Sequence, residues 1–477
     1  MYQEIDLVNK ARDFARIAHM DQKRKSGVEI YEHSKKVAEI LGGWGLGYTT
    51  QALGYLHNTV RRGAATVDDI KAEFGNEIGE LIESITNISN LQLREEKPQQ
   101  FVDSLIKMLL AMASDLRVVF VRLACRLDSL STFEYLSKSK QRENALEVLL
   151  VYAPLSERLG MGQVKAQLED LAFPYVYPKE YKRLTTTSFG FYKKAEGDMK
   201  KIKRRLLLKL SASGLKVQVN ARRKHLYSLW RKLERPEISW DFSKIHDIVA
   251  LRIIVDTVEN CYAALGIVHK NFTPVASIGV SDFIASPKPN GYQSIHTKVF
   301  SPTGGIVEVQ IRTQVMHEQA EYGLAAHWAY SEAKTKGVAG HKLEQGEIKP
   351  DADKLSWVKR LVSWKDEISD SEEFVKAVKF DIFAERIFVF TPKGDIYDLP
   401  IGATPVDFAY RIHTRMGNFI SGARVNGKMV TLNYKLKRGE VVEIIKSKNE
   451  KMPSREWLSF VVTGVAIREI KKRLNKK

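Results

Sequence analysis

The stretch PKPNGYQSIHTKVFSPTGGIVEVQIRT, residues 287–313, decides the fold of the region around it. It begins with a turn around Asn290 and Gly291 and continues into two runs rich in β-branched residues, HTKVF and IVEVQIRT. Runs of this length, bounded by Gly, Pro and Ser, are typical of β-strands. The runs LKVQVN and IVALRIIV lie upstream, and helix-like stretches separate them. Residues from about 196 to 335 are therefore predicted to form an α/β or α+β domain.

The sequence on either side has a different character. Residues 1 to about 190 are predicted to be helical, because apolar residues recur three and four apart, as in ALEVLLVYAPLSERLGMGQVKAQLEDLAF. GVAGHKLEQGEIKPDADK is polar and is predicted to be a loop, followed by a helix from about Lys354 to Phe374. Residues 386–446 are predicted to form a small β-rich unit with a short helix around PVDFAYRIH. The end, REWLSFVVTGVAIREIKKRLNKK, is predicted to be one basic amphipathic helix or two short ones.

The composition limits the class of protein. A chain of 477 residues is long enough for about three domains. Its formal net charge of +18 would attract polyanions such as nucleotides or RNA, although a lysine-rich solvated surface explains the charge equally well. Two cysteines provide no disulfide framework, which fits a reducing cytoplasm. The N-terminus lacks a signal-type apolar core, and no apolar run approaches the length of a membrane span.

The helical half contains an incomplete set of metal ligands. His33 lies in IYEHSKKVAEIL, and His57 and Asn58 lie in YLHNTVRRG. A hydrolytic site with two histidines and two aspartates uses carboxylate oxygens to hold Mn²⁺, which lowers the pKa of a bound water. Asn58 carries no charge, and the arginines at 61 and 62 would repel a cation. Two histidines at this spacing are also typical of ordinary helix side chains.

The second half contains charged residues suited to phosphate chemistry. ARRKHLYSLWRK, residues 221–232, combines basic and aromatic side chains that can bind a triphosphate, although a solvated helix face explains the stretch as well. Asp247 and Glu308 lie on separate strand-like runs and could share one Mg²⁺, which prefers one or two carboxylates plus substrate phosphates. Each acid alone is more often a plain surface residue.

These blocks together resemble the RelA/SpoT homologue family. The resemblance is carried by EHSKKVAEIL, YLHN and VRLACRLDSL, by RRKHLYSLWRK, HDIVALRIIV, PKPNGYQSIHT, VEVQIRT and AEYGLAAHWAY, and by FVFTPKGDIYDLP, in family order across residues 5–475. It implies a multidomain protein with an all-α HD-type domain, an α+β nucleotidyltransferase-like synthetase domain and a small β-grasp TGS domain. The implied boundaries are 1–155 for the HD-type domain, 156–195 for a helical connector, 196–335 for the synthetase domain, 336–384 for a linker, 385–447 for the TGS domain and 448–477 for the start of a C-terminal helical region.

The resemblance implies a reaction: transfer of pyrophosphate from ATP to the 3′-hydroxyl of GDP or GTP, which makes (p)ppGpp. Asp247 and Glu308 would hold Mg²⁺, and Glu308 could also orient or deprotonate the attacking hydroxyl. Tyr292 would stack on guanine, and Arg222 could stack on adenine. The implied nucleotide-binding residues are Arg222, Lys224, Lys232, Arg252, Lys288, Asn290, Tyr292, His296, Gln310 and Arg312.

The same resemblance implies that the hydrolase site is degenerate. Asn58 and Cys125 stand where the family has metal-binding aspartates, and the arginines at 61 and 62 replace acids. We therefore expect no Mn²⁺ and no (p)ppGpp hydrolysis, and an HD-type domain that serves regulation or packing. The alternative is a soft Zn²⁺ site, which the nearby arginines disfavour. The residues of this degenerate site are Arg24, His33, His57, Asn58, Cys125 and Ser129.

Two departures from the family pattern affect the synthetase half. The family's charged signature becomes Gly279, Val280, Ser281 and Asp282, and only Asp282 matches. Since this loop is tied to acceptor binding and metal preference in the family, it leaves open GDP-versus-GTP choice and the alternative of a non-catalytic nucleotide-binding regulator. A glycine–arginine–proline–lysine motif also becomes ARRK, in which the charged members survive.

The β-rich unit offers a possible partner contact. His413 matches a TGS histidine that faces the 3′ end of uncharged tRNA in ribosome-bound relatives, although it is equally well explained as an ordinary histidine. Long relatives continue with further domains, and this chain ends within the first helices after the TGS domain. We therefore expect weak RNA contact through the basic surface rather than stable docking to a ribosome.

Overall fold

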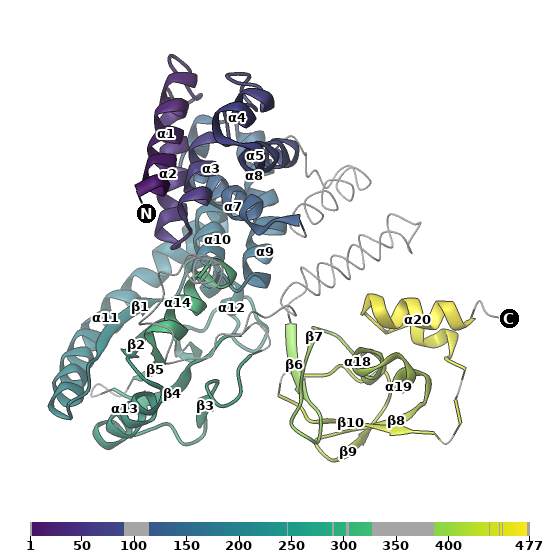
Figure 1. Cartoon of the computed structure of the whole chain (residues 1–477). Helices are drawn as coiled ribbons and strands as arrows, with labels where there is room; N and C mark the ends of the chain where they lie inside the picture. Colours follow the sequence, from purple (N-terminus) through teal and green to yellow (C-terminus); the bar gives the residue numbers. More distant parts are fainter. Residues whose placement is uncertain are drawn as a thin grey trace. The chain divides into compact units, whose positions relative to one another are not determined.

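The computed structural model describes residues 2–89, 114–245, 247–288, 291–301, 305–326, 386–437, 439–447, 449–450 and 452–474. The chain divides into two compact units: Met1–Arg94 with Lys107–Val358, and Glu95–Ile106 with Lys359–Lys477 (Figure 1). The predicted loop at 337–354, the predicted helix after it and Asn290 lie outside the described residues. No helix in the described part of the chain is long and apolar enough to cross a membrane.

The first unit begins with the predicted helical region (Figure 1). Gly54 decides how two of its helices pack, because a Cβ at this position would lie 2.8 Å from the Cα of Ala38. This close approach brings His33 and His57 to the same interface. The elements are α1 (Tyr2–Ala18), α2 (Ile30–Gly43), α3 (Tyr48–Leu56), α4 (Val67–Phe74), α5 (Asn76–Ser89), α7 (Leu116–Leu130), η1 (Phe133–Tyr135), α8 (Lys138–Glu147), the π-helical turn η2 (Val148–Tyr152) and α9 (Ala153–Arg158).

Two helices lead from this region to the sheet. They are α10 (Gly162–Val176) and α11 (Pro178–Ala212), and α11 passes through the boundary predicted at residue 195 without a break. Helix α11 ends at Ala212, Gly214 follows with φ +79°, and the N–H of Leu215 donates back to the carbonyl of Leu210. A glycine in the left-handed conformation at this place is a common helix terminator.

The first unit also contains a five-stranded sheet in the order β1-β2-β5-β4-β3, in which β2 and β5 are parallel and the other pairs antiparallel. Side chains alternate between the faces of a strand. One face is apolar, and its valines, leucines and isoleucines share a core with apolar residues of α11 and α13. The elements are β1 (Gln218–Arg223), α12 (Leu226–Leu233), η3 (Phe242–Lys244), β2 (Val249–Val255), α13 (Val258–Asn271), β3 (Val280–Asp282), β4 (Ile295–Phe300), β5 (Ile306–Thr313) and α14 (Gln314–Tyr322).

The second unit is a small β-rich domain, as predicted. Strands β6 and β7 pair with each other, and β10, β8 and β9 form a second antiparallel set. A parallel bridge between Phe390 and Val441 connects the two sets. The elements are β6 (Arg386–Phe390), β7 (Ile396–Pro400), α18 (Pro405–Ile412), α19 (Thr414–Asn418), β8 (Ile420–Val425), β9 (Lys428–Val430), β10 (Val442–Lys446), η6 (Arg455–Ser459) and α20 (Gly464–Leu474). The last two show that the predicted C-terminal helical segment is two short helices.

Candidate active site and a histidine–cysteine cluster

The polar face of the five-stranded sheet carries most of the predicted nucleotide site. Glu308, Gln310 and Arg312 alternate along β5, and the register places Arg252 of β2 and His296 of β4 opposite Gln310. Directly paired residues of neighbouring strands share a face. The fold therefore gathers side chains from four strands, since Arg222 of β1 also pairs with Ala250 next to Glu308.

Asp247 lies just before β2 and is held by two lysines. Lys224 Nζ donates to Asp247 Oδ2 at 2.6 Å, and Lys232 Nζ donates to Oδ1 at 2.8 Å. Burial alone would raise the pKa of Asp247, but the two ammonium groups outweigh this effect and lower the pKa to about 2. The carboxylate is therefore ionised throughout the physiological range.

Glu308 lies on β5, beside the strand that Asp247 precedes. Its Oε1 accepts a hydrogen bond from Gln310 Nε2 at 2.8 Å and lies 3.3 Å from His296 Nδ1. Burial raises the pKa of Glu308, but the bonds from His296 and Gln310 outweigh it and leave the pKa below its ordinary value. The negative charge of Asp247 acts on the same group in the opposite direction, so the two carboxylates are electrostatic neighbours.

These two acids are chemically suited to Mg²⁺. Both are ionised and precede or lie on adjacent parallel strands, and Mg²⁺ is commonly bound by one or two carboxylates together with substrate phosphates. The lysines that now neutralise Asp247 are also placed to meet phosphate oxygens.

A cluster of arginines surrounds Glu321 on the same face. Glu321 Oε1 lies 2.9 Å from Arg252 Nη2, 3.1 Å from Arg312 Nη2 and 4.0 Å from Arg222 Nη1. Burial and the charge of Arg312 lower the pKa of Arg252 to about 10. One carboxylate faces three guanidinium groups, so the cluster has an excess of positive charge and suits an anionic ligand.

Glu321 and His317 were missed by the sequence reasoning. His317 Nδ1 lies 3.7 Å from Glu321 Oε1, and burial and the neighbouring arginines lower the pKa of His317 to about 4. Both residues lie on α14, in HEQAEYG, where the i, i+4 spacing puts them on one side of the helix. That spacing was the available signal, but the arginines they meet lie on other elements.

Aromatic residues gather beside Glu308. The hydroxyl of Tyr292 is 2.7 Å from His296 Nε2, and the Nδ1 of the same ring faces Glu308, so His296 connects the predicted guanine-stacking ring to the predicted catalytic acid. Lys288 Nζ lies 4.8 Å from the centre of the Tyr292 ring and 4.4 Å from that of Phe283. Phe283 was not among the predicted residues.

The altered segment 279–282 lies against this aromatic group. It forms the edge strand β3, in which Ser281 pairs with His296. Asp282 is structural: its Oδ2 accepts from the Tyr262 hydroxyl at 3.0 Å, and its Oδ1 accepts from two backbone N–H groups at 2.9 Å. Val280 and Ser281 are exposed.

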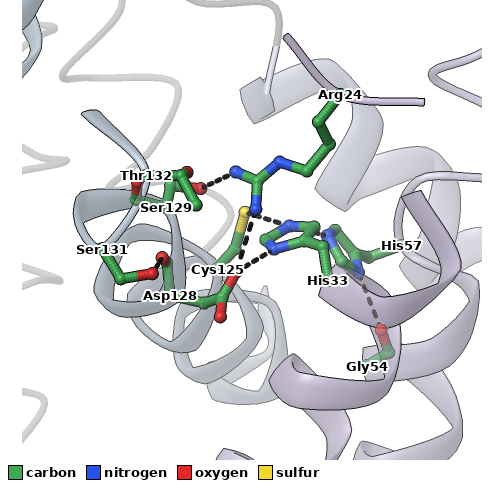
Figure 2. Close-up of polar contacts among 9 residues, drawn as sticks. All are labelled: Arg24, His33, Gly54, His57, Cys125, Asp128, Ser129, Ser131 and Thr132. Atoms are coloured by element: carbon green, nitrogen blue, oxygen red, sulfur yellow. Dashed lines mark hydrogen bonds and ion pairs between the residues drawn. The ribbon is translucent and has the colours of Figure 1, made fainter. Parts of the chain in front are cut away.

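In the helical region, His33, His57 and Cys125 form a second group, which we call the histidine–cysteine cluster (Figure 2). His57 Nε2 lies 3.3 Å from His33 Nε2, and Cys125 Sγ lies 3.5 Å from His33 Nε2. All three residues are buried, and their ligand atoms lie within 4.8 Å of one another. Burial raises the pKa of the Cys125 thiol, but the two imidazoles outweigh it and bring the pKa well below its ordinary value.

Neighbouring groups orient the cluster (Figure 2). His33 Nδ1 contacts Asp128 Oδ2 at 2.5 Å, and His57 Nδ1 contacts the carbonyl of Gly54 at 2.7 Å. Arg24 donates to the same oxygen of Asp128 at 3.2 Å, and its other terminal nitrogen lies 3.5 Å from Ser129 Oγ. Five residues of the predicted degenerate site meet here, namely Arg24, His33, His57, Cys125 and Ser129, while Asn58 is buried directly after His57. The supporting role of Asp128 was not predicted.

The histidine–cysteine cluster does not fit Mn²⁺. Its three converging atoms are two nitrogens and a sulfur, whereas Mn²⁺ favours carboxylate and water oxygens. Asp128 supplies a carboxylate nearby, but the oxygen described is in contact with His33 Nδ1 and Arg24.

In the second unit, His413 caps a helix. Its Nδ1 accepts a hydrogen bond from the backbone N–H of Arg415 at 3.1 Å, at the start of α19, and the side chain is exposed. This bond fixes the ring direction. The tRNA contact remains a prediction.

Comparison with known proteins identifies three regions. Residues 11–162 match the HD domain, residues 221–335 match the region found in RelA / SpoT proteins, and residues 387–446 match the TGS domain. The chain is 42% identical to the GTP pyrophosphokinase of Myxococcus xanthus, over 98% of this chain and 60% of that protein. It is 40% identical to the guanosine-3′,5′-bis(diphosphate) 3′-pyrophosphohydrolase of Aquifex aeolicus, over 99% of this chain and 65% of that protein.

Two further likenesses complete the comparison. The chain is 39% identical to the bifunctional (p)ppGpp synthase/hydrolase RelA of Mycobacterium tuberculosis, over 98% of this chain and 62% of that protein. A solved structure of small alarmone synthetase 1 from Bacillus subtilis aligns with 39% of this chain and 96% of its own, at 22% identity and a TM-score of 0.24, which is too low to support a conclusion. The chain thus spans between 60% and 65% of the length of these three curated relatives.

Proposed function

The chain belongs to the RelA/SpoT homologue family, and we propose that it is a (p)ppGpp synthetase that transfers pyrophosphate from ATP to the 3′-hydroxyl of GDP or GTP. One observation carries this proposal. Two ionised carboxylates are electrostatic neighbours: Glu308 lies on the polar face of the sheet with the arginine cluster, and Asp247, just before β2, is held by two lysines. Such a surface can position and neutralise polyphosphates, which is most of what phosphoryl-type transfer requires of a protein.

Each group in this site has a proposed task. Lys224, Lys232 and the arginine cluster bind phosphate oxygens, and Tyr292 stacks on the guanine base. Mg²⁺, held by Asp247 and Glu308, would neutralise charge on the transferred pyrophosphate. Glu308 also orients the acceptor hydroxyl and accepts its proton, a role that its ionised state permits.

We further propose that the HD-type domain has lost (p)ppGpp hydrolysis. The names of the relatives do not decide this, because they include a synthetase, a hydrolase and a bifunctional enzyme. The support is chemical: Asn58 and Cys125 provide no carboxylate, and arginines stand at positions 61 and 62, so the positions expected to hold Mn²⁺ and to activate water carry no acid.

A second candidate function is a non-catalytic nucleotide-binding regulator of the same family. It is favoured by the altered segment 279–282, in which Gly279 and Ser281 stand where the family has charged residues, and exposed Ser281 pairs with His296. In either case we propose a cytoplasmic protein whose TGS domain and basic surface contact RNA weakly, with His413 as the candidate tRNA contact.

An assay of synthesis tests the proposal and separates the two candidates. The purified chain is incubated with labelled ATP, GDP or GTP and Mg²⁺, beside the variants Glu308→Gln and Glu318→Gln. Glu318 is exposed on α14, so its amide variant is a matched control for the loss of one carboxylate. We expect (p)ppGpp from the wild type and Glu318→Gln, and at least about a hundredfold less from Glu308→Gln. Nucleotide binding without product in any sample would support the regulator instead.

A further inference from the structure

We propose that the histidine–cysteine cluster binds one Zn²⁺ ion, with His33 Nε2, His57 Nε2 and Cys125 Sγ as ligands. The site would be a soft-metal site in a domain that no longer has the ligands for Mn²⁺. The proposal does not depend on the synthetase activity, because the cluster lies on α2, α3 and α7 rather than on the sheet (Figures 1 and 2).

Two of the three separations between the ligand atoms match a tetrahedral zinc site, and all three are within 4.8 Å. Zinc–nitrogen bonds of about 2.0–2.1 Å and zinc–sulfur bonds of about 2.3 Å place neighbouring ligands of a tetrahedron about 3.3–3.4 Å apart for two nitrogens and about 3.6 Å apart for nitrogen and sulfur. The observed separations are 3.3 Å between the two Nε2 atoms and 3.5 Å between Sγ and His33 Nε2. Side-chain packing without a bound ion would not by itself require both separations to match those of a zinc site.

The ring orientations point to the same conclusion. His33 Nδ1 faces a carboxylate and His57 Nδ1 faces a backbone carbonyl, so each Nδ1 carries a hydrogen, and in the neutral rings each Nε2 offers a lone pair. Two lone pairs 3.3 Å apart repel each other unless a proton or a metal ion lies between them. The pairing of a zinc-binding histidine with a carboxylate or a backbone carbonyl is the usual support of such ligands.

The neighbouring positive charges oppose a cation less than the sequence suggested. Arg24 is paired with Asp128 at 3.2 Å, which neutralises it locally. Arg62 is exposed, so water and salt screen its charge. Arg61 is exposed too but less well screened, because burial and Arg122 lower its pKa and its charge interacts with Cys125. Asn58 Oδ1, on the residue that follows His57, is buried and has no hydrogen-bond partner among the described residues.

The ion would join three helices that are distant in sequence. His33 is on α2, His57 directly follows α3 and Cys125 is on α7. We assign it a structural role, because two basic residues occupy positions 61 and 62, where hydrolysis would need an acid. Zinc binding should therefore raise the unfolding temperature of the full chain without creating hydrolysis of (p)ppGpp.

Metal content and cobalt spectroscopy on the full chain test the site. Protein freed of metal by a chelator is titrated with Zn²⁺ against a chromophoric competitor, and in parallel with Co²⁺. The variant is Cys125→Ser, and the matched control is Cys261→Ser, since Cys261 is the other buried free cysteine. We expect one Zn²⁺ per chain in the wild type and Cys261→Ser, and at least about tenfold weaker binding in Cys125→Ser.

The Co²⁺ spectrum is recorded on the wild-type protein, so it tests the site even if a variant does not fold. Wild-type protein with Co²⁺ should show a thiolate-to-cobalt charge-transfer band and the visible absorption of a tetrahedral ion. Binding of much less than one Zn²⁺ per chain, absence of the thiolate band in the wild type, or equal zinc affinity in Cys125→Ser would each overturn the proposal.

Discussion

At the scale of single residues, the buried carboxylate of Glu321 neutralises part of the positive charge of the arginine cluster. It is the anionic partner described for Arg252 and Arg312, whose side chains are 10% and 1% exposed. Glu321→Gln would leave these guanidinium groups without it, and breaking a buried ion pair in this way costs roughly 3–5 kcal/mol. We expect a lower unfolding temperature for Glu321→Gln and a larger rise on adding pyrophosphate, because the anion replaces the lost charge.

The control for this experiment is Glu318→Gln on the same helix. Glu318 is exposed, and its carboxylate contacts Gln314. Its loss should change the free energy of unfolding by less than about 0.5 kcal/mol. Equal stability of the two variants, or no difference in their response to pyrophosphate, would show that the arginine cluster does not depend on Glu321.

Residues whose role is set within a strand were predictable from the sequence, and those whose role depends on distant contacts were not. Glu308 was predictable because VEVQIRT is a strand with alternating polar residues. Glu321 was not, because its partner Arg252 lies 69 positions earlier, as the difference between the two residue numbers gives. The soft site on His33, His57 and Cys125 was disfavoured because arginines stand at positions 61 and 62, and the exposure of these arginines is visible only in the fold.

At the scale of elements, the strongest constraint is the contact between α14 and the turn before α10. Gly323 follows α14 with φ +53°, and a Cβ there would lie 2.1 Å from the carbonyl oxygen of Leu159. The next residue, Leu324, donates its N–H to that carbonyl at 2.8 Å. Gly323→Ala combines a left-handed backbone with a clash against another backbone, so we expect a loss of more than about 2 kcal/mol in urea unfolding.

The matched control is Gly190→Ala. Gly190 lies within α11, and nothing stands within 4 Å of a Cβ placed there. Alanine in an exposed helix should stabilise the protein by about 0.4–1 kcal/mol. If Gly323→Ala were as stable as Gly190→Ala, the contact between α14 and the turn at Leu159 would not be the constraint described.

A buried acid in α10 makes the stability depend on pH. Glu169 is 9% exposed, and burial raises its pKa from 4.5 to about 7, against the opposing charge of Lys165. The folded protein therefore binds more protons than the unfolded chain between about pH 4.5 and pH 7, and this contribution to stability is lost as the pH rises through that window.

Glu169→Gln should remove this dependence, because glutamine does not ionise. Between pH 5 and pH 8 the wild type should lose about 2.5 kcal/mol of unfolding free energy that the variant keeps, at about 1.36 kcal/mol per pKa unit. Urea unfolding at the two pH values measures this loss. Parallel stability curves for the two proteins would contradict the raised pKa.

The elements themselves were largely predictable. The run IVEVQIRT is β5 from its first residue to its last, and PVDFAYRI is α18. Two features were not predicted from the sequence. Helix α11 crosses the predicted boundary at 195 because its terminator is Gly214, and the edge strand β3 is only three residues long, too short for a periodic signal.

The whole molecule consists of two units with separate cores. In the first, the sheet and α11 share one apolar cluster, and in the second, α18 packs into clusters of its own. In the second unit, Asp407 of α18 connects to the segment before α20, because its Oδ1 accepts hydrogen bonds from the backbone N–H groups of Val462 and Thr463. The candidate active site and the histidine–cysteine cluster both lie in the first unit.

The central claim is that this chain makes (p)ppGpp and does not destroy it. A single time course tests both halves. Labelled ATP and GDP are incubated with the purified chain, Mg²⁺ and Mn²⁺, and hexokinase with glucose is then added to remove ATP. We predict that ppGpp rises and afterwards stays at a plateau. A decline after ATP is removed would show that hydrolysis survives, and the absence of any rise would show that synthesis does not.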